Sequence, residues 1–577
     1  MTMLTKWGAT LDRSCPLPEY PRPQLRRESF YNLNGVWDYA VTPSGEEPEV
    51  WDGEIVVPFS PEAPLSGAAR GPAKDEYLHY RRGFTLPEGF QKSRVLLHFG
   101  AVDQIAEVFV NGVSAAKHSG GYWPFSADIT SLLREGENIL RVTVRDNADD
   151  PTFAYGKQRY KRGGMWYTAQ SGIWQTVWLE SVPEVYVKSL RITPEFDEAR
   201  VRIELETALE SGAAITCDVR AADGSFVAGS WAKGGVCVVP LPGFRAWSPD
   251  DPYLYTLDIT CGEDHVESYF AMRKFSYVEL GGHKVFGLNN APLFHNGLLD
   301  QGYYPDGLLT PPSDEAMVND IETMKRCGFN MLRKHIKIEP LRWYYHCDRL
   351  GMVVWQDMVS GGQPYSFLHV SALPTLGKVD LPDQDAKPYG RSGVLSRARF
   401  RREMADTVRL LYNCPCIALW TVFNEGWGQF DALDMANELK KLDPTRFIDH
   451  ASGWQDQGYE EMKSRHIYFR PVKLKNDGRA LALTEYGGYI LAVDGHRWTD
   501  KVFGYRICRD SAALAHDYEK LMLGQVLPHI RKEGLTAAVY TQITDVEEEL
   551  NGLMTYDREV LKIPEETLRE INKQLKF

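Results

Sequence analysis

Three features are missing from this sequence: a surplus of basic residues, a long apolar run and a CxxC pair of cysteines. Lys and Arg number 65 against 78 Asp and Glu, giving a net charge of −13 over 577 residues. Proteins that bind nucleic acids normally carry a basic surplus, so no nucleic-acid partner is expected. No stretch approaches the roughly 20 apolar residues that cross a membrane. The first eight residues contain no apolar signal core, so we predict a cytoplasmic protein without a membrane partner.

The nine cysteines do not have the spacing of a metal-binding or redox pair. Cys414 and Cys416 are separated by one residue, which suits a metal site poorly, and the HExxH pattern is absent. We therefore expect buried free thiols in a reducing compartment, no metal ion and no cofactor.

The length predicts about three or four domains of roughly 150 residues each. Residues 1–182 contain many short strand patterns separated by Gly and Pro, which is typical of a jelly-roll β-sandwich, and Asn111-Gly112 is a hairpin-turn signal. Residues 183–276 continue in short strands and fit an immunoglobulin-like β-sandwich. From residue 277 to 577, short apolar strands alternate with helical patterns, which predicts a TIM (β/α)8 barrel.

The barrel region contains eight strand patterns, with helices predicted at Asp314–Cys327, Leu341–Leu350 and Arg397–Leu411. Residues 358–396, rich in Gly, Pro and Ser, are predicted to form a long loop on the face of the barrel that carries active sites. The eight predicted strands are Pro292–Leu298, Asn330–His335, Met352–Asp357, Ile417–Asn424, Phe447–Ser452, His466–Arg470, Leu481–Glu485 and Ala537–Asp545.

Two glutamates lie at matching strand ends. Glu425 follows Asn424 at the end of the fourth predicted strand, and Glu485 ends the seventh. A barrel brings the carboxyl ends of its strands to one face, so both side chains should reach one cleft. A carboxylate pair can cleave a glycosidic bond, with retention at a separation of about 5–5.5 Å and inversion at about 6.5–9.5 Å. A salt bridge at the barrel rim would explain either glutamate alone, but the pair favours catalysis.

The motifs around these residues resemble glycoside hydrolase family 2, whose members include β-galactosidases, β-glucuronidases and β-mannosidases. The resemblance covers nearly the whole chain. Tyr31–Trp37 resembles the opening of the family's N-terminal sugar-binding domain, and Ser171–Glu180 resembles its closing strand. Trp247–Tyr255 resembles the end of the immunoglobulin-like domain, and Gly328–Arg333 resembles the second barrel strand.

The resemblance implies a role for each residue of the predicted cleft. Glu485 would be the nucleophile, and Glu425 would act first as acid and then as base. Asn424 would bind the hydroxyl next to the anomeric carbon, and Arg333 would keep Glu485 ionised. An indole suits the apolar face of a sugar ring, so we expect either Trp454 or Trp427 to line the pocket. Further substrate-binding candidates at or near strand ends are His335, Tyr468, Asp300 and Gln542.

The positions that recognise the sugar depart from the family pattern. Trp166 stands six residues before Gly172, where many members have an aspartate, and Gly488 stands three after the predicted nucleophile, where β-galactosidases of the best-known type have a histidine. The Asn-x-Lys pair by which β-glucuronidases hold a carboxylate is not evident. Pockets set sugar identity through a few polar groups, so specificity is not inherited from the family as a whole.

We therefore predict an exo-acting retaining glycoside hydrolase, with a terminal β-galactoside as the first choice of substrate. A β-galactofuranoside, an α-L-arabinofuranoside or a β-glucuronide are the alternatives under the same mechanism. A non-catalytic carbohydrate-binding protein is the second hypothesis, because a fold alone does not establish a reaction. The expected partner is a glycan or glycoside, and large barrels of this kind often pair into homo-oligomers.

Overall fold

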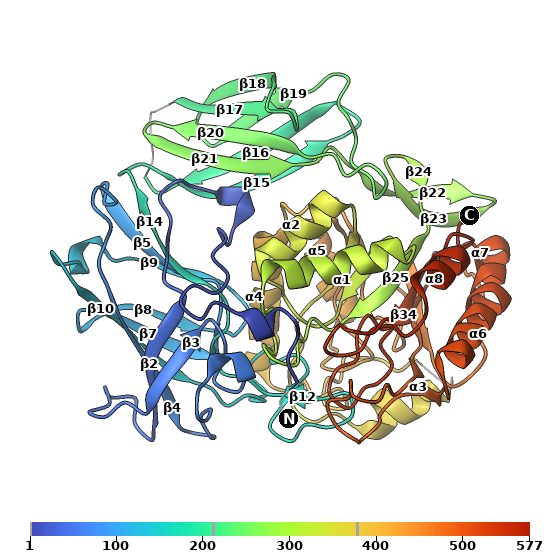
Figure 1. Cartoon of the computed structure of the whole chain (residues 1–577). Coiled ribbons are helices and arrows are strands. Elements are labelled where there is room, and N and C mark those ends of the chain that lie inside the picture. The colour runs from blue at the N-terminus through green and yellow to red at the C-terminus, as the bar shows by residue number, and fades with distance from the viewer. Residues whose placement is uncertain (1–2, 210–213, 377–379) are drawn as a thin grey trace.

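The computed structural model describes residues 3–209, 214–376 and 380–577. Two β-sandwiches precede a β/α barrel (Figure 1). The first sandwich lies to the left of the barrel in this view, and the second lies above both. The predicted fold class is therefore confirmed. The boundaries after residues 182 and 276 stay predictions.

The first sandwich packs a six-stranded sheet against a four-stranded sheet, both antiparallel. Side chains from the two sheets form one apolar core, with Trp37, Val108 and Leu179 among its buried members. Asn111 and Gly112 have φ values of 51° and 82°, the left-handed conformation that a tight hairpin turn requires, so the predicted turn is confirmed. The six-stranded sheet has the order β3 (Gly53–Val57), β2 (Gly35–Thr42), β4 (Tyr77–Phe84), β10 (Asn138–Arg145), β7 (Ile105–Val110) and β8 (Val113–Ser119). The four-stranded sheet has the order β1 (Tyr31–Asn32), β14 (Val177–Val182), β5 (Arg94–Phe99) and β9 (Phe125–Asp128). Two short ladders pair β6 (Val102–Asp103) with β13 (Gly172–Ile173) and β11 (Gln158–Arg159) with β12 (Tyr167–Thr168).

The second sandwich has three strands in one sheet and four in the other. Apolar residues alternate along strands such as β16, where Val201, Ile203 and Leu205 point into the core between the sheets. The strands are β15 (Val187–Glu195), β16 (Arg200–Thr207) and β19 (Val236–Pro240), and β18 (Phe226–Lys233), β17 (Ala214–Arg220), β20 (Tyr255–Cys261) and β21 (Asp264–Phe270).

The barrel consists of eight parallel strands whose hydrogen-bonded order is nearly closed. Nearly every strand residue is buried, as expected for a parallel sheet covered by helices. A small antiparallel sheet of β22 (Phe275–Leu280), β23 (His283–Leu288) and β24 (Ala291–Pro292) precedes it. In sheet order the barrel strands are β29 (Phe447–Asp449), β28 (Ile417–Thr421), β27 (Val353–Asp357), β26 (Met331–Lys334), β25 (His295–Asp300), β34 (Leu535–Thr541), β31 (Ala480–Gly487) and β30 (Met462–Ile467).

Helices lie between several of the barrel strands. The first begins after Ser313, whose hydroxyl accepts a hydrogen bond from the Ala316 amide and so caps the helix, while Asp314 and Glu315 favour its positive end. The helices are α1 (Asp314–Arg326), α2 (Leu341–Leu350), α4 (Val394–Leu411), α5 (Ala432–Leu442), α6 (Ser511–Leu521), α7 (Leu527–Glu533) and α8 (Glu565–Asn572).

Several predicted strand ends were wrong by two to four residues, and some of these errors move a candidate site residue. The first barrel strand runs to Asp300, so Asp300 ends the strand instead of following it. Strand β30 ends at Ile467, which puts Tyr468 just beyond it, and β34 ends at Thr541, which puts Gln542 just beyond that strand. Apolar runs mark the existence of a buried strand better than its ends, because turn residues at a barrel mouth are also buried.

The long segment after β27 is only partly irregular. It contains the helical turns η5 (Leu368–Ala372) and α3 (Leu373–Thr375), and residues 377–379 of the predicted loop lie outside the described part of the chain. The loop packs against the segment that follows β29, because Gln455 donates to the His369 carbonyl oxygen at 2.7 Å and accepts from the Leu381 amide at 2.7 Å. Among the described residues, no helix has both the length and the apolar character to cross a membrane.

Candidate active site

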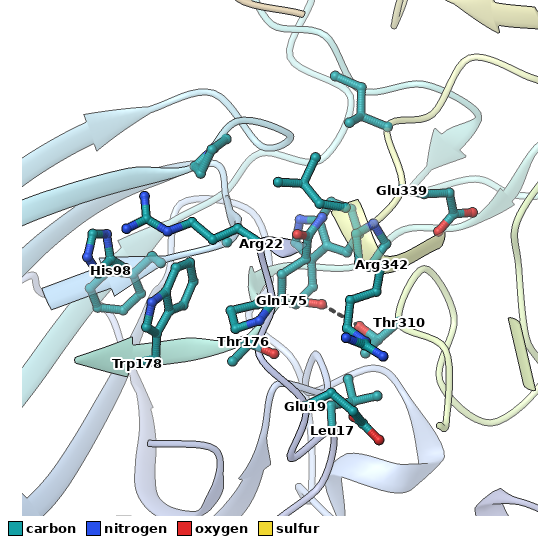
Figure 2. A pocket seen from close by; sticks show the side chains of 18 of the residues that line it. Leu17, Glu19, Arg22, His98, Gln175, Thr176, Trp178, Thr310, Glu339 and Arg342 are labelled. Carbon is teal, nitrogen blue, oxygen red and sulfur yellow. Dashed lines mark hydrogen bonds between the residues drawn. The ribbon is translucent and has the colours of Figure 1, made fainter. Parts of the chain in front are cut away.

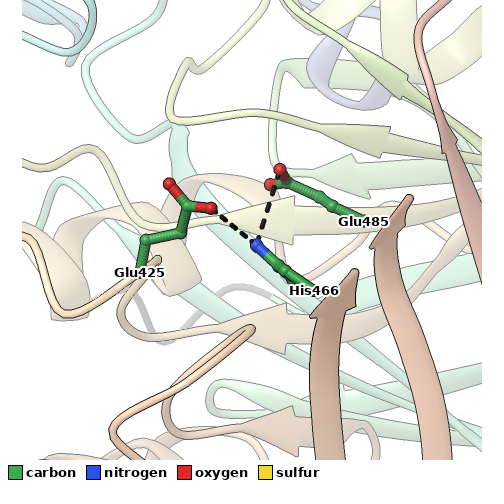
Figure 3. Close-up of side chains that lie close together, drawn as sticks. All are labelled: Glu425, His466 and Glu485. Carbon is green, nitrogen blue, oxygen red and sulfur yellow. Dashed lines mark hydrogen bonds and ion pairs between the residues drawn. The ribbon is translucent and has the colours of Figure 1, made fainter. Parts of the chain in front are cut away.

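The barrel brings the two predicted glutamates to the same end of the sheet. Glu485 lies near the end of β31, and Glu425 follows β28 at a left-handed backbone position with φ of 54°. Asn424 forms an isolated bridge with Ser452, which extends the strand direction beyond β28. Figure 3 shows both carboxylates pointing toward the ring of His466, which comes from β30 between them.

His466 bridges the carboxylate pair. Its Nδ1 lies 2.8 Å from Oε1 of Glu425 and 3.5 Å from Oε2 of Glu485 (Figure 3). One carboxylate oxygen of Glu425 and one of Glu485 lie within 4.8 Å of each other. Burial lowers the pKa of His466 to about 4, so the ring is neutral near pH 7.

The two glutamates have different electrostatic surroundings. Burial raises the pKa of Glu425 to about 7, while the charges of Lys157 and Arg333 oppose this shift. Burial also raises the pKa of Glu485 above its ordinary value, and His466 and Arg333 oppose it. Only Glu485 is bound directly by a cationic side chain, because its Oε1 accepts from Nη1 of Arg333 at 3.1 Å. Glu425 is therefore the better proton donor and Glu485 the better anion near neutral pH.

Arg333 holds three of the site's acceptors in place. Its guanidinium donates to Glu485, to Oδ1 of Asn424 at 2.8 Å, and to both oxygens of Asp357 at 3.0 Å each. The side chain is fully buried, so losing an acceptor would leave part of a buried charge unpaired. Burial would raise the pKa of Asp357, but Arg333 and His335 hold it at about 2. Asp357 therefore remains a fixed negative charge that positions Arg333.

Tyr468 reaches the other oxygen of Glu485. Its hydroxyl donates to Oε2 at 2.5 Å and lies 2.9 Å from Oγ1 of Thr541. Tyr505 stacks on the Tyr468 ring with centroids 3.9 Å apart. The placement of Tyr468 next to Glu485 agrees with the suggestion that it contacts the nucleophile.

Three other predicted residues have partners of their own. His335 Nδ1 lies 2.8 Å from Oδ2 of Asp357, so it borders the Arg333 network. Asp300 accepts from Nζ of Lys334 at 2.6 Å and is thus engaged in a buried ion pair. Gln542 accepts from Gln301 at 2.9 Å and donates to Asn551 at 2.8 Å.

The two candidate indoles occupy different positions. Trp454 is half-buried, and its Nε1 donates to the backbone oxygen of Glu425 at 2.9 Å. Trp427 is 5% exposed and packs edge-on against Trp166, with ring centroids 5.0 Å apart. Trp454 therefore keeps an open face beside Glu425, whereas Trp427 supports a wall. Trp166, at the position of the missing aspartate, forms part of that wall.

Several residues at the site were missed by the sequence reasoning, and one of them, Lys157, comes from the first sandwich. The segment around it docks on the barrel, because the Tyr155 and Gly156 amides donate to the Ser360 oxygen at 3.1 and 2.9 Å. Lys157 is half-buried, 5.7 Å from the Tyr167 ring centroid, and its charge acts on Glu425. Sequence offered no signal for it, since the contact joins elements some 200 residues apart. The other missed residues are His466, Asp357, Tyr505 and Glu549.

Within the described part of the chain, two groups of side chains have a spacing that a metal ion could bridge. One is the pair itself with His466, and the other is His496, Asp557 and Glu559. In the second group His496 Nδ1 already lies 2.7 Å from Asp557, and Glu559 is exposed. An ion pair explains that second group, and the chemistry of a glutamate pair explains the first without a cation.

A separate cavity of about 230 Å³ lies where the first sandwich meets the barrel. Figure 2 shows Arg22, His98 and Trp178 on its sandwich side and Arg342 on its barrel side. Arg22 donates to Glu180 at 2.6 Å, and Arg342 donates to Asp314, so both cations are paired. The cavity thus lies at a domain junction and not at the carboxylate pair.

A barrel with a glutamate pair at its C-terminal face, preceded by two β-sandwiches, defines a class of sugar-processing enzyme folds. Three profiles of one family match the chain in order. They are the sugar-binding domain of glycosyl hydrolases family 2 at residues 64–183, a second family 2 domain at 185–273, and the family 2 TIM barrel at 311–474. Together they cover more than half of the chain, so the chain belongs to glycoside hydrolase family 2. The barrel match includes Glu425 and ends before Glu485.

Curated relatives are distant and carry two kinds of name. A β-galactosidase of Halalkalibacterium halodurans is 23% identical over 79% of this chain and 45% of its own length. A β-glucuronidase of Paenibacillus borealis is 23% identical over 82% of this chain and 85% of its own length. Among solved structures, a β-glucuronidase from an uncultured Clostridium superimposes with a TM-score of 0.74 at 19% identity, covering 95% of this chain and 98% of the other. The chain thus spans about half the length of the β-galactosidase.

Proposed function

We propose that this protein is a retaining exo-glycosidase that releases a terminal, non-reducing sugar. Glu485 attacks the anomeric carbon while Glu425 protonates the departing oxygen, and Glu425 then takes a proton from the water that releases the sugar. The observation that carries the proposal is the closeness of the pair, with carboxylate oxygens within 4.8 Å. That spacing fits attack by a glutamate and leaves little room for an intervening water.

The surroundings of the pair support this division of roles. Glu425 has a pKa of about 7, so a large fraction of the protein carries the required proton near neutral pH. Arg333 and Tyr468 hold both oxygens of Glu485. Asn424 is held by Arg333 beside the pair, where its amide can bind the hydroxyl next to the anomeric carbon.

A β-galactoside is the proposed substrate, with a β-glucuronide as the main competitor. The name of the H. halodurans relative supports the first, and the longer match to the P. borealis relative supports the second. Glu549, in the turn after β34, is a buried carboxylate, and a negative charge there favours a neutral sugar. Furanosides remain alternative substrates, because Trp166 and Gly488 stand at positions where other family members have residues that recognise the sugar.

The test is hydrolysis of a panel of p-nitrophenyl glycosides by the full-length protein. The panel contains β-galactopyranoside, β-glucuronide, β-mannoside, β-glucoside, β-galactofuranoside and both α-L-arabinosides. We expect one strong activity, on β-galactopyranoside, with retained anomeric configuration in the released sugar by proton NMR. An inverted product would contradict the mechanism, and strong activity on the glucuronide alone would reassign the substrate. No hydrolysis, together with binding on a glycan array, would favour the carbohydrate-binding hypothesis.

The pH dependence of kcat/KM should fall on the alkaline side with a pKa of about 7. Glu425 must carry a proton to assist the leaving group, and burial holds its pKa at about 7, so activity should drop roughly tenfold per pH unit above that value. The acid side should fall as Glu485 gains a proton, at a pH above the ordinary glutamate range. Initial rates between pH 4 and 10 measure both limbs, and a profile that stays flat to pH 9 would remove Glu425 from the acid role.

A further inference from the structure

The turn Val546–Glu549 follows β34. It brings to the sugar site the carboxylate of Glu549, a group that the proposed mechanism does not use. The turn is closed by two backbone hydrogen bonds between Val546 and Glu549, at 3.0 and 2.9 Å. Glu549 is 4% exposed and accepts a hydrogen bond from the Tyr167 hydroxyl of the first sandwich. A buried carboxylate is costly unless it is bound, so its presence near the catalytic pair calls for a function.

Tyr505 connects Glu549 to the catalytic pair. Its ring stacks on Tyr468, which donates to Glu485. Burial and the charges of Glu425, Glu549 and Glu485 raise the pKa of the Tyr505 hydroxyl far above its ordinary value. The geometry agrees, because the Tyr468 hydroxyl lies 2.9 Å from Oγ1 of Thr541 at the end of β34, and Glu549 forms a backbone bridge with Phe503, two residues before Tyr505. The turn that carries Glu549 therefore lies beside the carboxylate pair.

A chain of amides ends beside Glu549. Gln301 donates to Gln542 at 2.9 Å, and Gln542 donates to Oδ1 of Asn551 at 2.8 Å. Asn551 is fully buried, and its Nδ2 has no hydrogen-bond partner among the described residues. The amides of Gln542 and Asn551 lie close enough to Glu549 to lower its pKa, against the larger effect of burial. Glu549 keeps a small exposed fraction, so its carboxylate can accept a hydrogen bond from a sugar hydroxyl, while the buried Asn551 amide lies behind it.

We propose that Glu549, held by the Tyr167 hydroxyl and backed by the Asn551 amide, binds a hydroxyl of the terminal sugar and makes the site selective for neutral sugars over uronates. This inference rests on the proposed glycosidase function and assigns its substrate class. A uronate carries a carboxylate where the neutral sugar has a hydroxymethyl group. Placed beside Glu549 in a buried site, that charge would be repelled, whereas a hydroxyl would be bound.

Lys157 is the cation that could oppose this selectivity. It has no ion pair among the described residues, so it could in principle attract a uronate. The charge of Lys157, however, lowers the pKa of both Glu549 and Glu425. Lys157 therefore already offsets the negative charge of these two carboxylates. Lys157 therefore balances Glu549 and leaves no net positive charge for a second carboxylate.

The test is the affinity for two matched sugar pairs, galactose with galacturonate and glucose with glucuronate, by isothermal titration at pH 7. Members of each pair differ only at C6. We expect the wild-type protein to bind one neutral sugar at least tenfold more tightly than its uronate. Glu549→Gln should weaken the affinity for the neutral sugar by about 10-fold to 100-fold, as expected for loss of a charged hydrogen bond. It should also reduce the preference for the neutral sugar over the uronate.

Glu548→Gln is the matched control. Glu548 belongs to the same turn and accepts from the Gly164 amide at 2.9 Å, so it also docks the first sandwich. This variant should leave both affinities unchanged. Circular dichroism and thermal unfolding will show whether Glu549→Gln folds. If it does not, Asn551→Ala replaces it and should weaken the affinity for the neutral sugar about tenfold.

A wild-type protein that binds the uronate as tightly as the neutral sugar would overturn the inference, as would an unchanged preference in the folded Glu549→Gln variant. Loss of uronate binding in Lys157→Met would identify Lys157 as a carboxylate clamp and would also overturn it. Absence of binding to all four sugars contradicts it as well. Because these measurements need no turnover, failure of the hydrolysis panel with intact selectivity would reject the proposed reaction alone.

Discussion

Glu485→Gln should lower kcat for the preferred glycoside by on the order of 10⁴-fold or more, with the protein still folded. A glutamine has nearly the same shape and its one amide oxygen can still accept from Arg333 or from Tyr468, but the amide does not attack the anomeric carbon. Both good and poor leaving groups should lose activity to a similar extent, because the bond to the enzyme cannot form. Steady-state rates with p-nitrophenyl and alkyl glycosides measure this loss.

Two controls make that result specific to Glu485. Glu461→Gln, just before β30 and hence at the amino-terminal end of the barrel, should keep full activity. A 2-deoxy-2-fluoro glycoside should trap the covalent intermediate of the wild-type protein, and mass spectrometry of the digest should find the label on the peptide that contains Glu485. A label on another carboxylate, or full activity of Glu485→Gln, would contradict the assignment.

The glutamate pair could be predicted because its position follows from a regular pattern. Strands Ile417–Thr421 and Ala480–Gly487 are continuous apolar runs, and a parallel barrel brings such strands to a common end. Residues at or shortly beyond the carboxyl ends of these strands reach the same side of the barrel whatever the details of the loops. The three-part architecture followed in the same way from a change of pattern along the chain, from short strands to strands alternating with helices.

Residues that depend on the docking of separate units could not be predicted. Lys157 and Tyr167 belong to a segment of the first sandwich that rests on the barrel loops, and no local pattern indicates that contact. In the sequence, Glu549 is one of three consecutive glutamates. The sequence does not reveal which of the three is buried against Tyr167. Asp300 was predicted to bind sugar from its place near a strand end; it forms an ion pair with Lys334, and its contact with a sugar stays a prediction.

Trp427 and Trp454 show that burial decides which of two similarly placed indoles is accessible to a sugar ring. Both follow barrel strands closely, and both could have stacked on a sugar. Trp427 is held between Trp166 and Tyr155, with ring centroids 5.0 and 5.8 Å away, and so forms a wall between the first sandwich and the barrel. Trp454 is tied to the Glu425 backbone by its Nε1 and keeps part of its ring accessible. Trp454 is therefore the better candidate of the two for stacking on a sugar, and that role stays a prediction.

Glu425→Ala should have a different effect from Glu485→Gln, because it removes a proton donor and leaves the nucleophile intact. Hydrolysis of a substrate with a poor leaving group, such as an alkyl glycoside, should fall by about 10²–10⁴-fold. A 2,4-dinitrophenyl glycoside needs no proton to depart, so its first step should proceed at nearly the wild-type rate and the covalent intermediate should accumulate.

Azide should then rescue the Glu425→Ala variant and yield a glycosyl azide of retained configuration, since the anion needs no general base and fits the space left by the side chain. The alkaline limb near pH 7 should also disappear for the activated substrate, because the group with that pKa is gone. Equal losses for both leaving groups would instead assign Glu425 to binding. The contrast between the two variants thus separates the roles of carboxylates that lie within 4.8 Å of each other.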